Sequence, residues 1–271
     1  MDQVRRKLVL STWKAPKEGN IYGKLTVNAD IALRYLEYRS QKTDNKLTIT
    51  HFVGCCIARS IQKTPTINGF IRWGNFVPHQ EVSISFLVAL QEGKNLANTK
   101  VSKADGLNIE QMASAIRSSS KKLRKGKDAA FQKSQKSLRF MPNWLIRPLL
   151  WFSGWATSSL GVSLPMLGLE SFPFGVCMIT SVGMFGLDEA FAPHTPFARV
   201  PIIVLIGAIR KTPIVKGDEI VIAPMMTMTA TIDHRYIDGV QGAMLAKHIR
   251  HLFENPWECD NLDAPPEDFH V

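Results

Sequence analysis

The chain of 271 residues lacks any apolar run long enough to cross a membrane. A spanning helix needs roughly 20 consecutive apolar residues. The best candidate, residues 144–169, is interrupted by Arg147, Pro148 and Pro165. Residues 1–7 are polar, so the start of the chain has no apolar core of a secretory signal peptide. We therefore predict a cytoplasmic protein with no membrane-spanning segment.

Cysteine is scarce, and its spacing does not match the known zinc motifs. The four residues are Cys55, Cys56, Cys177 and Cys259, and none forms the paired spacing of a structural zinc site. Two are adjacent, and the chain is not a small secreted scaffold, so we predict reduced thiols in the core. His248 and His251 stand one helical turn apart without a carboxylate or cysteine beside them, and we predict no metal site.

Acidic residues are outnumbered by basic ones. Lys and Arg number 33 against 23 Asp and Glu, which gives a net charge of +10. This charge favours anionic partners such as phosphorylated cofactors, acidic carrier proteins, nucleic acid or a membrane surface, and composition alone does not choose among them. No recognised nucleic-acid-binding motif accompanies the charge, so we do not expect a nucleic-acid partner.

The sequence does contain clear alternating and amphipathic segments. Strand patterns occur at residues 22–29, 82–90, 176–182, 201–209 and 225–232. Four segments have helical patterns. The first follows the cap candidates Asn28 or Asp30, the second runs from Thr48 to before Pro65, and the last two cover residues 108–125 and 241–253. Because strands and helices do not alternate strictly, we predict an α+β domain with a mixed sheet. This single domain spans residues 1–256, and an acidic flexible tail, 257–271, follows it.

One histidine, His234, stands directly after the strand pattern 225–232 and before an Asp-Gly step, Asp238-Gly239. A strand end holds an imidazole on a rigid support, which general-base catalysis requires. A structural histidine that closes the strand is the alternative interpretation.

The block His-x-x-x-Asp-Gly formed by His234, Asp238 and Gly239 resembles the active-site motif of the chloramphenicol acetyltransferase superfamily. The longer form, Asp-His-Arg-x-x-Asp-Gly at residues 233–239, is similar to the catalytic domain of the 2-oxoacid dehydrogenase acyltransferases, the E2 components. Further ordered similarities lie at residues 46–53, 65–69, 93–105, 179–186 and 207–215. The resemblance thus covers nearly the whole chain, from about residue 22 to residue 256.

The resemblance implies a chloramphenicol acetyltransferase-like mixed sheet with flanking helices, assembled as a homotrimer or a higher oligomer. It also implies coenzyme A or acyl-CoA as a substrate and a site shared between subunits. In full-length members, lipoyl and subunit-binding domains precede this core. We expect none here, and we therefore expect a lipoyl or acyl-carrier domain to bind in trans. No cofactor-binding residues can be assigned from the sequence.

Within the resemblance, His234 is the general base. Thr180 stands where the family has its hydroxyl donor to the oxyanion, and Ser181 is a rival because it follows directly. Alternation places the two on opposite faces of the strand, and a hydroxyl bonded to the backbone is the alternative role. Asp238 would pair with an arginine, Arg5 or Arg6, although a carboxylate here can equally cap the last helix. No Ser or Cys nucleophile elbow is visible, so we expect direct transfer without an acyl-enzyme.

Two departures from the family leave other functions open. An insertion at about 129–174 follows a basic stretch and is rich in tryptophan. It could form a membrane-surface element, a dock for an acidic carrier protein, a lid over an acyl-binding cavity, or a helical hairpin that packs on the domain or extends the trimer contact. The family's Pro-Val-Ile-Arg segment is replaced by residues 99–102. The alternatives to a coenzyme A-dependent acyltransferase are therefore a non-catalytic E2-like trimeric scaffold and a membrane-associated enzyme with a hydrophobic acceptor, peripheral to a membrane.

Overall fold

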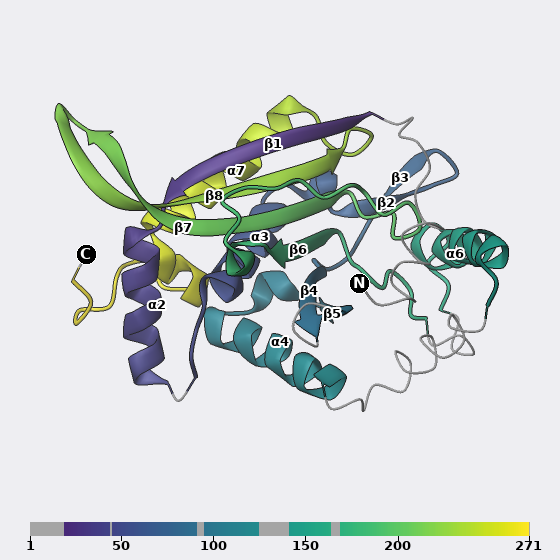
Figure 1. The fold of residues 1–271 in the computed structure, drawn as a ribbon, viewed down its shortest axis with the longest axis horizontal. Coiled ribbons are helices and arrows are strands. Elements are labelled where there is room, and N and C mark those ends of the chain that lie inside the picture. The colour runs from purple at the N-terminus through teal and green to yellow at the C-terminus, as the bar shows by residue number, and fades with distance from the viewer. Residues whose placement is uncertain (1–18, 44, 91–94, 125–140, 164–168, 271) are drawn as a thin grey trace.

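A six-stranded mixed sheet forms the centre of the molecule (Figure 1). The computed structural model describes residues 19–43, 45–90, 95–124, 141–163 and 169–270. In spatial order the strands are β1 (Asn20–Asn28), β8 (Glu219–Asp233), β7 (Ile202–Lys216), β6 (Cys177–Ser181), β4 (Ile84–Leu90) and β5 (Asn95–Val101). Strands β4, β6 and β7 are parallel to one another, and the remaining pairs are antiparallel. A small separate hairpin consists of β2 (Gly69–Arg72) and β3 (Asn75–Pro78).

Helices cover one face of this sheet. They are α2 (Asp30–Lys42), α3 (Ile49–Gln62), α4 (Ile109–Arg124) and α7 (Gly239–Glu254). The main core joins their apolar sides to alternate residues of the strands, such as Ile179, Val204 and Met228. Helix α3 is buried along almost its whole length because it packs under both α4 and α7. Its first turn is held by a capping box between Thr48 and His51.

The opposite face of the sheet carries a second, smaller core. Met178, Ile203 and Leu205 point to this side and pack against Ala198 and Val200. These partners belong to the segment between β6 and β7, which begins with η5 (Gly183–Phe185) and folds back over the sheet. Among the described residues, no helical residue belongs to this smaller core.

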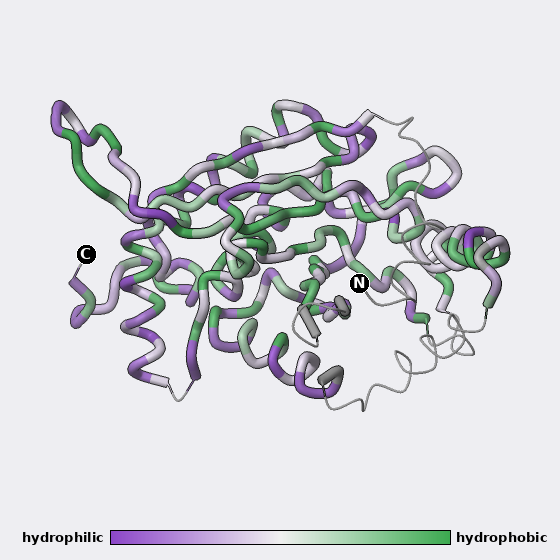
Figure 2. Tube along the Cα trace, in the orientation of Figure 1, coloured by the Kyte–Doolittle hydropathy of each residue, from purple (hydrophilic) through white to green (hydrophobic). Residues whose placement is uncertain are grey.

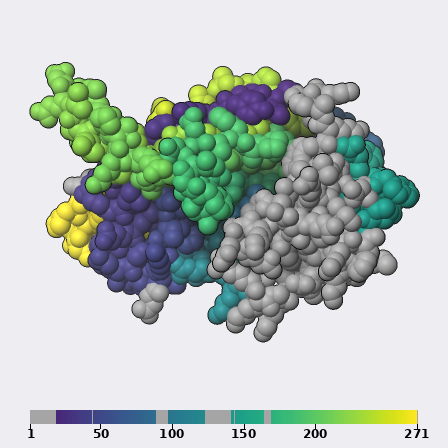
Figure 3. Space-filling view, viewed as in Figure 1, coloured from purple at the N-terminus to yellow at the C-terminus, as the bar shows by residue number. Residues whose placement is uncertain are grey.

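Strands β7 and β8 extend beyond the body of the molecule as a long hairpin, which projects at the upper left of Figures 1 and 3. Figure 2 shows a hydrophobic stem and a hydrophilic tip. In the stem Val215, Ile220 and Ile222 are between 74% and 78% exposed. Apolar side chains of this size and exposure indicate a surface that another chain covers.

The predicted strands and helices are confirmed in position, but several elements are longer or new. The pattern predicts β7 and β8 only as residues 201–209 and 225–232, without the projecting stem. The pattern does not predict strand β5. Helix α6 (Asn143–Ser158) lies within the insertion, and among the described residues no helix is long and apolar enough to span a membrane.

The segment after residue 256 was expected to be a flexible tail. Over its described part it packs on the domain through η6 (Pro256–Asp260) and through Phe269, which is 8% exposed. Asp260 accepts a hydrogen bond from the Tyr35 hydroxyl and pairs with Arg39. Acidic composition suggested a mobile tail, whereas these aromatic and ionic contacts anchor the segment to α2.

Candidate active site

His234 is the first residue after strand β8. The strand end is held to the neighbouring β7 side by a hydrogen bond from the Asp233 amide to the Pro201 carbonyl. The Nδ1 atom of His234 lies 3.0 Å from the carbonyl oxygen of Ile237. Because a carbonyl only accepts, Nδ1 carries the proton and Nε2 presents its lone pair. The side chain is exposed, so this lone pair is free to take a proton from a bound substrate.

The neighbouring residues stiffen this turn. Arg235 donates to the Asp233 carboxylate from its backbone amide and its guanidinium. Burial raises the pKa of Asp233, but the hydrogen bonds from Arg235 outweigh it and hold the pKa below its usual range. The turn that carries His234 is thus fixed by a charged pair on one side and by the Ile237 carbonyl on the other.

Asp238 caps helix α7. Its carboxylate accepts hydrogen bonds from the amides of Val240 at 2.8 Å and Gln241 at 3.2 Å, and the Gln241 side chain accepts from the Asp238 amide. This is the helix-cap role that the sequence left open. Its predicted pairing with Arg5 or Arg6 stays a prediction, because both arginines lie outside the described residues.

Thr180 and Ser181 form the end of β6, opposite Leu205 and Ile206 of β7. Thr180 shares the face of Met178, which is the face without helices, whereas Ser181 alternates with it toward the helices. We find no hydrogen bond from the Thr180 hydroxyl to any other described residue. Within the described part of the chain, no backbone group therefore occupies this hydroxyl.

The loop after Thr180 is fixed to strand β7 by two glycines. A Cβ atom on Gly183 would lie 2.5 Å from the carbonyl oxygen of Gly207, and one on Gly207 would lie 1.9 Å from that of Asp188. Only glycine allows the two backbones to approach this closely. The contact sits beside the irregularity in β7 between Ile206 and Ile209, and it sets the position of the β6 end.

Within one chain, His234 and Thr180 lie at opposite ends of the sheet. Ile232 of β8 pairs with Ile202 of β7, so the antiparallel register places His234 level with residue 200. Thr180 of β6 pairs with Leu205 of β7. A difference of five positions along β7 corresponds to about 16 Å, and two strand spacings add about 10 Å sideways. One chain therefore does not bring both groups to one thioester.

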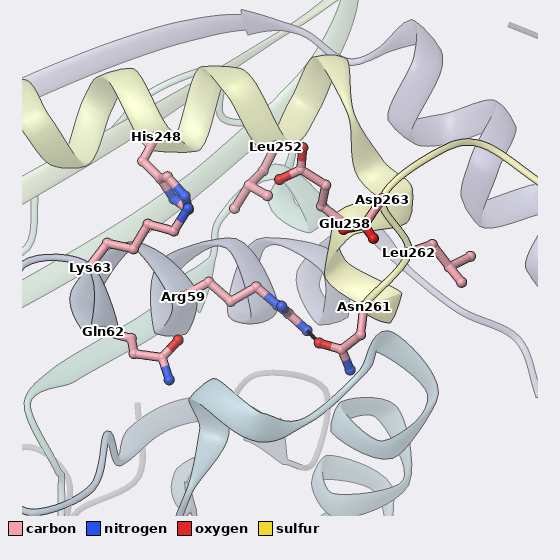
Figure 4. Close-up of a pocket in the computed structure, with 9 residues that line it drawn as sticks. All are labelled: Arg59, Gln62, Lys63, His248, Leu252, Glu258, Asn261, Leu262 and Asp263. Atoms are coloured by element: carbon pink, nitrogen blue, oxygen red, sulfur yellow. Dashed lines mark hydrogen bonds between the residues drawn. The ribbon is translucent and has the colours of Figure 1, made fainter.

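An apolar cavity of about 260 Å³ lies between the helices α3 and α7 and the strands β1, β8 and β7. Asp238 and Gly239, which directly follow the His234 turn, are among its lining residues. A second, polar cavity of about 290 Å³ lies between α3, the end of α7 and η6, as Figure 4 shows. None of the predicted catalytic residues lines this polar cavity.

Each of the two histidines near the polar cavity has a protein partner on one ring nitrogen, while the buried Nε2 of His248 has none among the described residues. His248 Nδ1 is 3.0 Å from the Ser60 hydroxyl, and His251 Nε2 is 2.7 Å from Glu258. Burial lowers the pKa of His248. Among the described residues no group of three or more His, Cys, Asp and Glu side chains is arranged to hold a metal ion. The four cysteines are all buried and free, as core thiols should be.

The mixed sheet, the helical layer on one face and the histidine at the end of β8 match the chloramphenicol acetyltransferase-like fold. The solved chloramphenicol acetyltransferase matches with a TM-score of 0.51, at 10% identity and over 93% of this chain. The probable dihydrolipoamide acetyltransferase of Listeria monocytogenes 4b F2365 matches with a TM-score of 0.68, at 19% identity over 94% of this chain and 93% of that one. At these identities the similarity establishes the fold.

Sequence comparison assigns the family. Residues 4–136 and 166–259 match the 2-oxoacid dehydrogenases acyltransferase (catalytic domain), and the chain belongs to this family. The Bacillus subtilis (strain 168) dihydrolipoyllysine-residue acetyltransferase component of the acetoin cleaving system is 26% identical over 259 residues, 93% of this chain and 54% of the relative. The corresponding component of the Rickettsia bellii pyruvate dehydrogenase complex is 25% identical over 241 residues, 88% of this chain and 46% of the relative. The chain thus spans about half the length of these relatives.

One further solved structure concerns the roles of a serine, a histidine and an asparagine in the catalytic mechanism of the Azotobacter vinelandii dihydrolipoamide acetyltransferase. It matches with a TM-score of 0.65 at 18% identity, over 94% of this chain and 88% of that one. The family match is interrupted between residues 136 and 166, and this gap contains α6. The insertion noted in the sequence, at about 129–174, therefore surrounds the part that the family model does not match.

Proposed function

We propose that the chain transfers an acyl group between coenzyme A and a thiol, with His234 as the general base. The observation that carries this proposal is the hydrogen bond between His234 Nδ1 and the Ile237 carbonyl. It fixes the tautomer in which Nε2 accepts a proton, and the end of β8 holds that atom in place. The family assignment supports the reaction class.

In the proposed step, His234 Nε2 removes the proton from the attacking thiol. The thiolate sulfur forms a bond to the thioester carbonyl carbon, and the carbonyl oxygen becomes an oxyanion. The hydroxyl of Thr180 donates a hydrogen bond to this oxyanion. The carbon–sulfur bond of the original thioester then breaks, and the leaving thiolate takes the proton back from His234. Both thiols bind at once, so no acyl-enzyme forms.

We propose a homotrimer in which His234 of one subunit works with Thr180 of the next. The register of the sheet supports this, because about 16 Å along the strands and about 10 Å across them separate the two groups within one chain. The exposed apolar stem of the β7–β8 hairpin also supports a contact between chains. A cyclic arrangement gives every subunit the same interface and closes the ring.

The relatives are named for a dihydrolipoyllysine residue as the acyl acceptor. We propose a lipoyl group as the thiol partner here too, carried by a lipoyl domain that binds in trans. The net charge of +10 favours an acidic carrier domain and the phosphates of coenzyme A.

A peripheral membrane contact through α6 is a second candidate. Trp144 is 76% exposed and Trp151 is 61% exposed, and Phe152 and Leu145 lie partly exposed on the same helix. Tryptophan at an exposed helix surface is typical of interfacial helices. Flotation with vesicles that contain anionic lipid tests this: Trp144→Ser with Trp151→Ser should abolish co-flotation. Failure of the unchanged protein to float would reject the contact.

The test of the main proposal is thiol release from acyl-CoA with free lipoamide as acceptor. His234→Ala should lower kcat by about 10²–10⁴-fold while the oligomer elutes unchanged from a sizing column. The matched control is His251→Ala, since this exposed histidine contacts Glu258 and lies in α7 away from the turn. Equal activity of His234→Ala and the unchanged protein would reject the role of His234. A chain that neither turns over nor binds coenzyme A would be a scaffold.

A further inference from the structure

The cavity beneath α7 exists because small residues face each other across the helix and the sheet. It lies where the first half of α7 crosses strands β1 and β8, and small residues on both sides leave it open. The helix contributes Gly242 and Ala246, and the strands contribute Gly23 and Ala230. Larger apolar side chains, including Leu25 and Ile249, close its walls.

Gly242 is not required by packing or by the backbone. A Cβ atom added to Gly242 would have no atom of another described part of the chain within 4 Å, and the φ of Gly242 is not among the positive values. Glycine inside a helix costs about 1 kcal/mol relative to alanine. Helix α7 therefore carries a destabilising residue that, among the described residues, leaves space in this cavity.

The cavity suits a hydrocarbon chain. Its lining is mostly apolar, although Lys24, Ser60, Thr229 and Asp238 also contribute to it. Over most of this surface a polar ligand would leave its hydrogen-bonding groups unpaired. Spaces lined by aliphatic side chains bind hydrocarbons. A methylene group takes up about as much space as a water molecule, ~30 Å³. A cavity of about 260 Å³ thus holds a chain of about eight carbons.

One end of the cavity lies beside the turn that carries His234. Asp238 and Gly239 line it, and they directly follow Ile237, whose carbonyl holds the imidazole of His234. A thioester bound beside His234 could therefore extend its acyl tail along the inner side of α7. The sulfur and the coenzyme A portion would remain outside, toward solvent.

We propose that this cavity binds the tail of the acyl group, and that the substrate is a medium-chain acyl thioester of roughly six to ten carbons. The inference rests on the proposed acyltransferase function and specifies its substrate class. It assigns the small residues of α7, above all Gly242, to selection of acyl length.

The test compares Gly242→Leu, which fills the cavity, with Ala243→Leu on the exposed side of the same helix turn. The measured quantity is the ratio of kcat/KM for octanoyl-CoA to that for acetyl-CoA, with lipoamide as acceptor. The ratio should favour octanoyl-CoA in the unchanged protein and should fall at least about tenfold in Gly242→Leu. Ala243→Leu should keep the ratio. An equal ratio in all three proteins would overturn the proposal.

A second measurement does not depend on turnover. Binding of 1-octanol, followed as a rise in melting temperature, should occur in the unchanged protein and in Ala243→Leu but not in Gly242→Leu. If Gly242→Leu fails to fold, Gly242→Ala provides the milder filling variant. Retained octanol binding in a folded filled variant would overturn the cavity assignment. Absence of turnover with every acyl-CoA, together with normal octanol binding, would instead reject the proposed acyl transfer.

Discussion

Mixing two inactive variants should restore activity if the site is shared between subunits. His234→Ala removes the base, and Thr180→Ala removes the oxyanion donor, so each homotrimer should lose at least about 10²-fold in kcat. The two groups lie about 16 Å apart along the strands and about 10 Å apart across them in one chain. Each complete site would therefore take His234 from a subunit that carries the Thr180 change and Thr180 from its neighbour.

The size of the recovery follows from the ring. In a random equal mixture, each position carries the required variant with probability one half, so about a quarter of the sites are complete. Co-refolded mixtures should thus reach about a quarter of the unchanged activity, measured as thiol release from acyl-CoA. The control is an equal mixture of the double variant with the unchanged chain. If sites are shared between subunits, this mixture should again have about a quarter of the unchanged activity, whereas sites within one chain would give about half. No recovery in mixtures that native mass spectrometry shows to be mixed trimers would refute the shared site.

Three further predictions concern single residues. Thr180→Val should lower kcat by about 10²–10³-fold, and Ser181→Ala should change it little, because Ser181 faces the helices; steady-state kinetics distinguish them. Asp238→Ala should lower the free energy of unfolding by about 1 kcal/mol while Asp238→Asn keeps the cap, as urea unfolding will measure. Burial and Arg117 lower the pKa of His51 to about 4. The unfolded chain therefore protonates near pH 6.5 but the folded chain does not, and the free energy of unfolding should fall by about 3 kcal/mol as pH drops from 6.5 to 4.

The matched variant for the pH prediction is His51→Gln. Glutamine at this position can still accept from the Thr48 amide and complete the capping box, but it does not titrate. Urea unfolding of His51→Gln should lose most of the slope between pH 6.5 and 4, and an unchanged slope would refute the assignment to His51. A greater kinetic loss in Ser181→Ala than in Thr180→Val would reverse the choice of donor. Equal stability of the two Asp238 variants would show that the cap contributes little.

Local patterns were sufficient for most of the fold. The alternation at residues 176–182 locates β6, and the capping signal at Thr48 locates the start of α3, because both depend on neighbouring residues. The same alternation places Thr180 and Ser181 on opposite faces of β6. The position of His234 after β8 followed from the strand pattern and the Asp-Gly step alone.

The remaining features depend on contacts that are distant in the sequence. The residues near position 215 give no local sign that β7 continues beyond the main sheet, because the stem is a strand only through its pairing with β8. The anchoring of Phe269 depends on Tyr35, far away in the chain. The cavity depends on the coincidence of Gly242 with Gly23 and Ala230 across two layers. Only the small residues in the first turns of α7 hint locally at a cavity. A helical pattern does not show whether such residues face a cavity or a packed neighbour.

The pairing of the first described strand with the last has a consequence for how the protein is made. Strand β1 pairs with β8 from Asn20 opposite Asp233 to Asn28 opposite Met225. At a synthesis rate of about 5–20 residues per second, β1 waits roughly 10–40 s on the ribosome before its partner emerges. The sheet therefore closes only when the strand that precedes His234 has left the exit tunnel. In each new chain the closed sheet and the turn that carries His234 therefore form together, late in the synthesis of this domain.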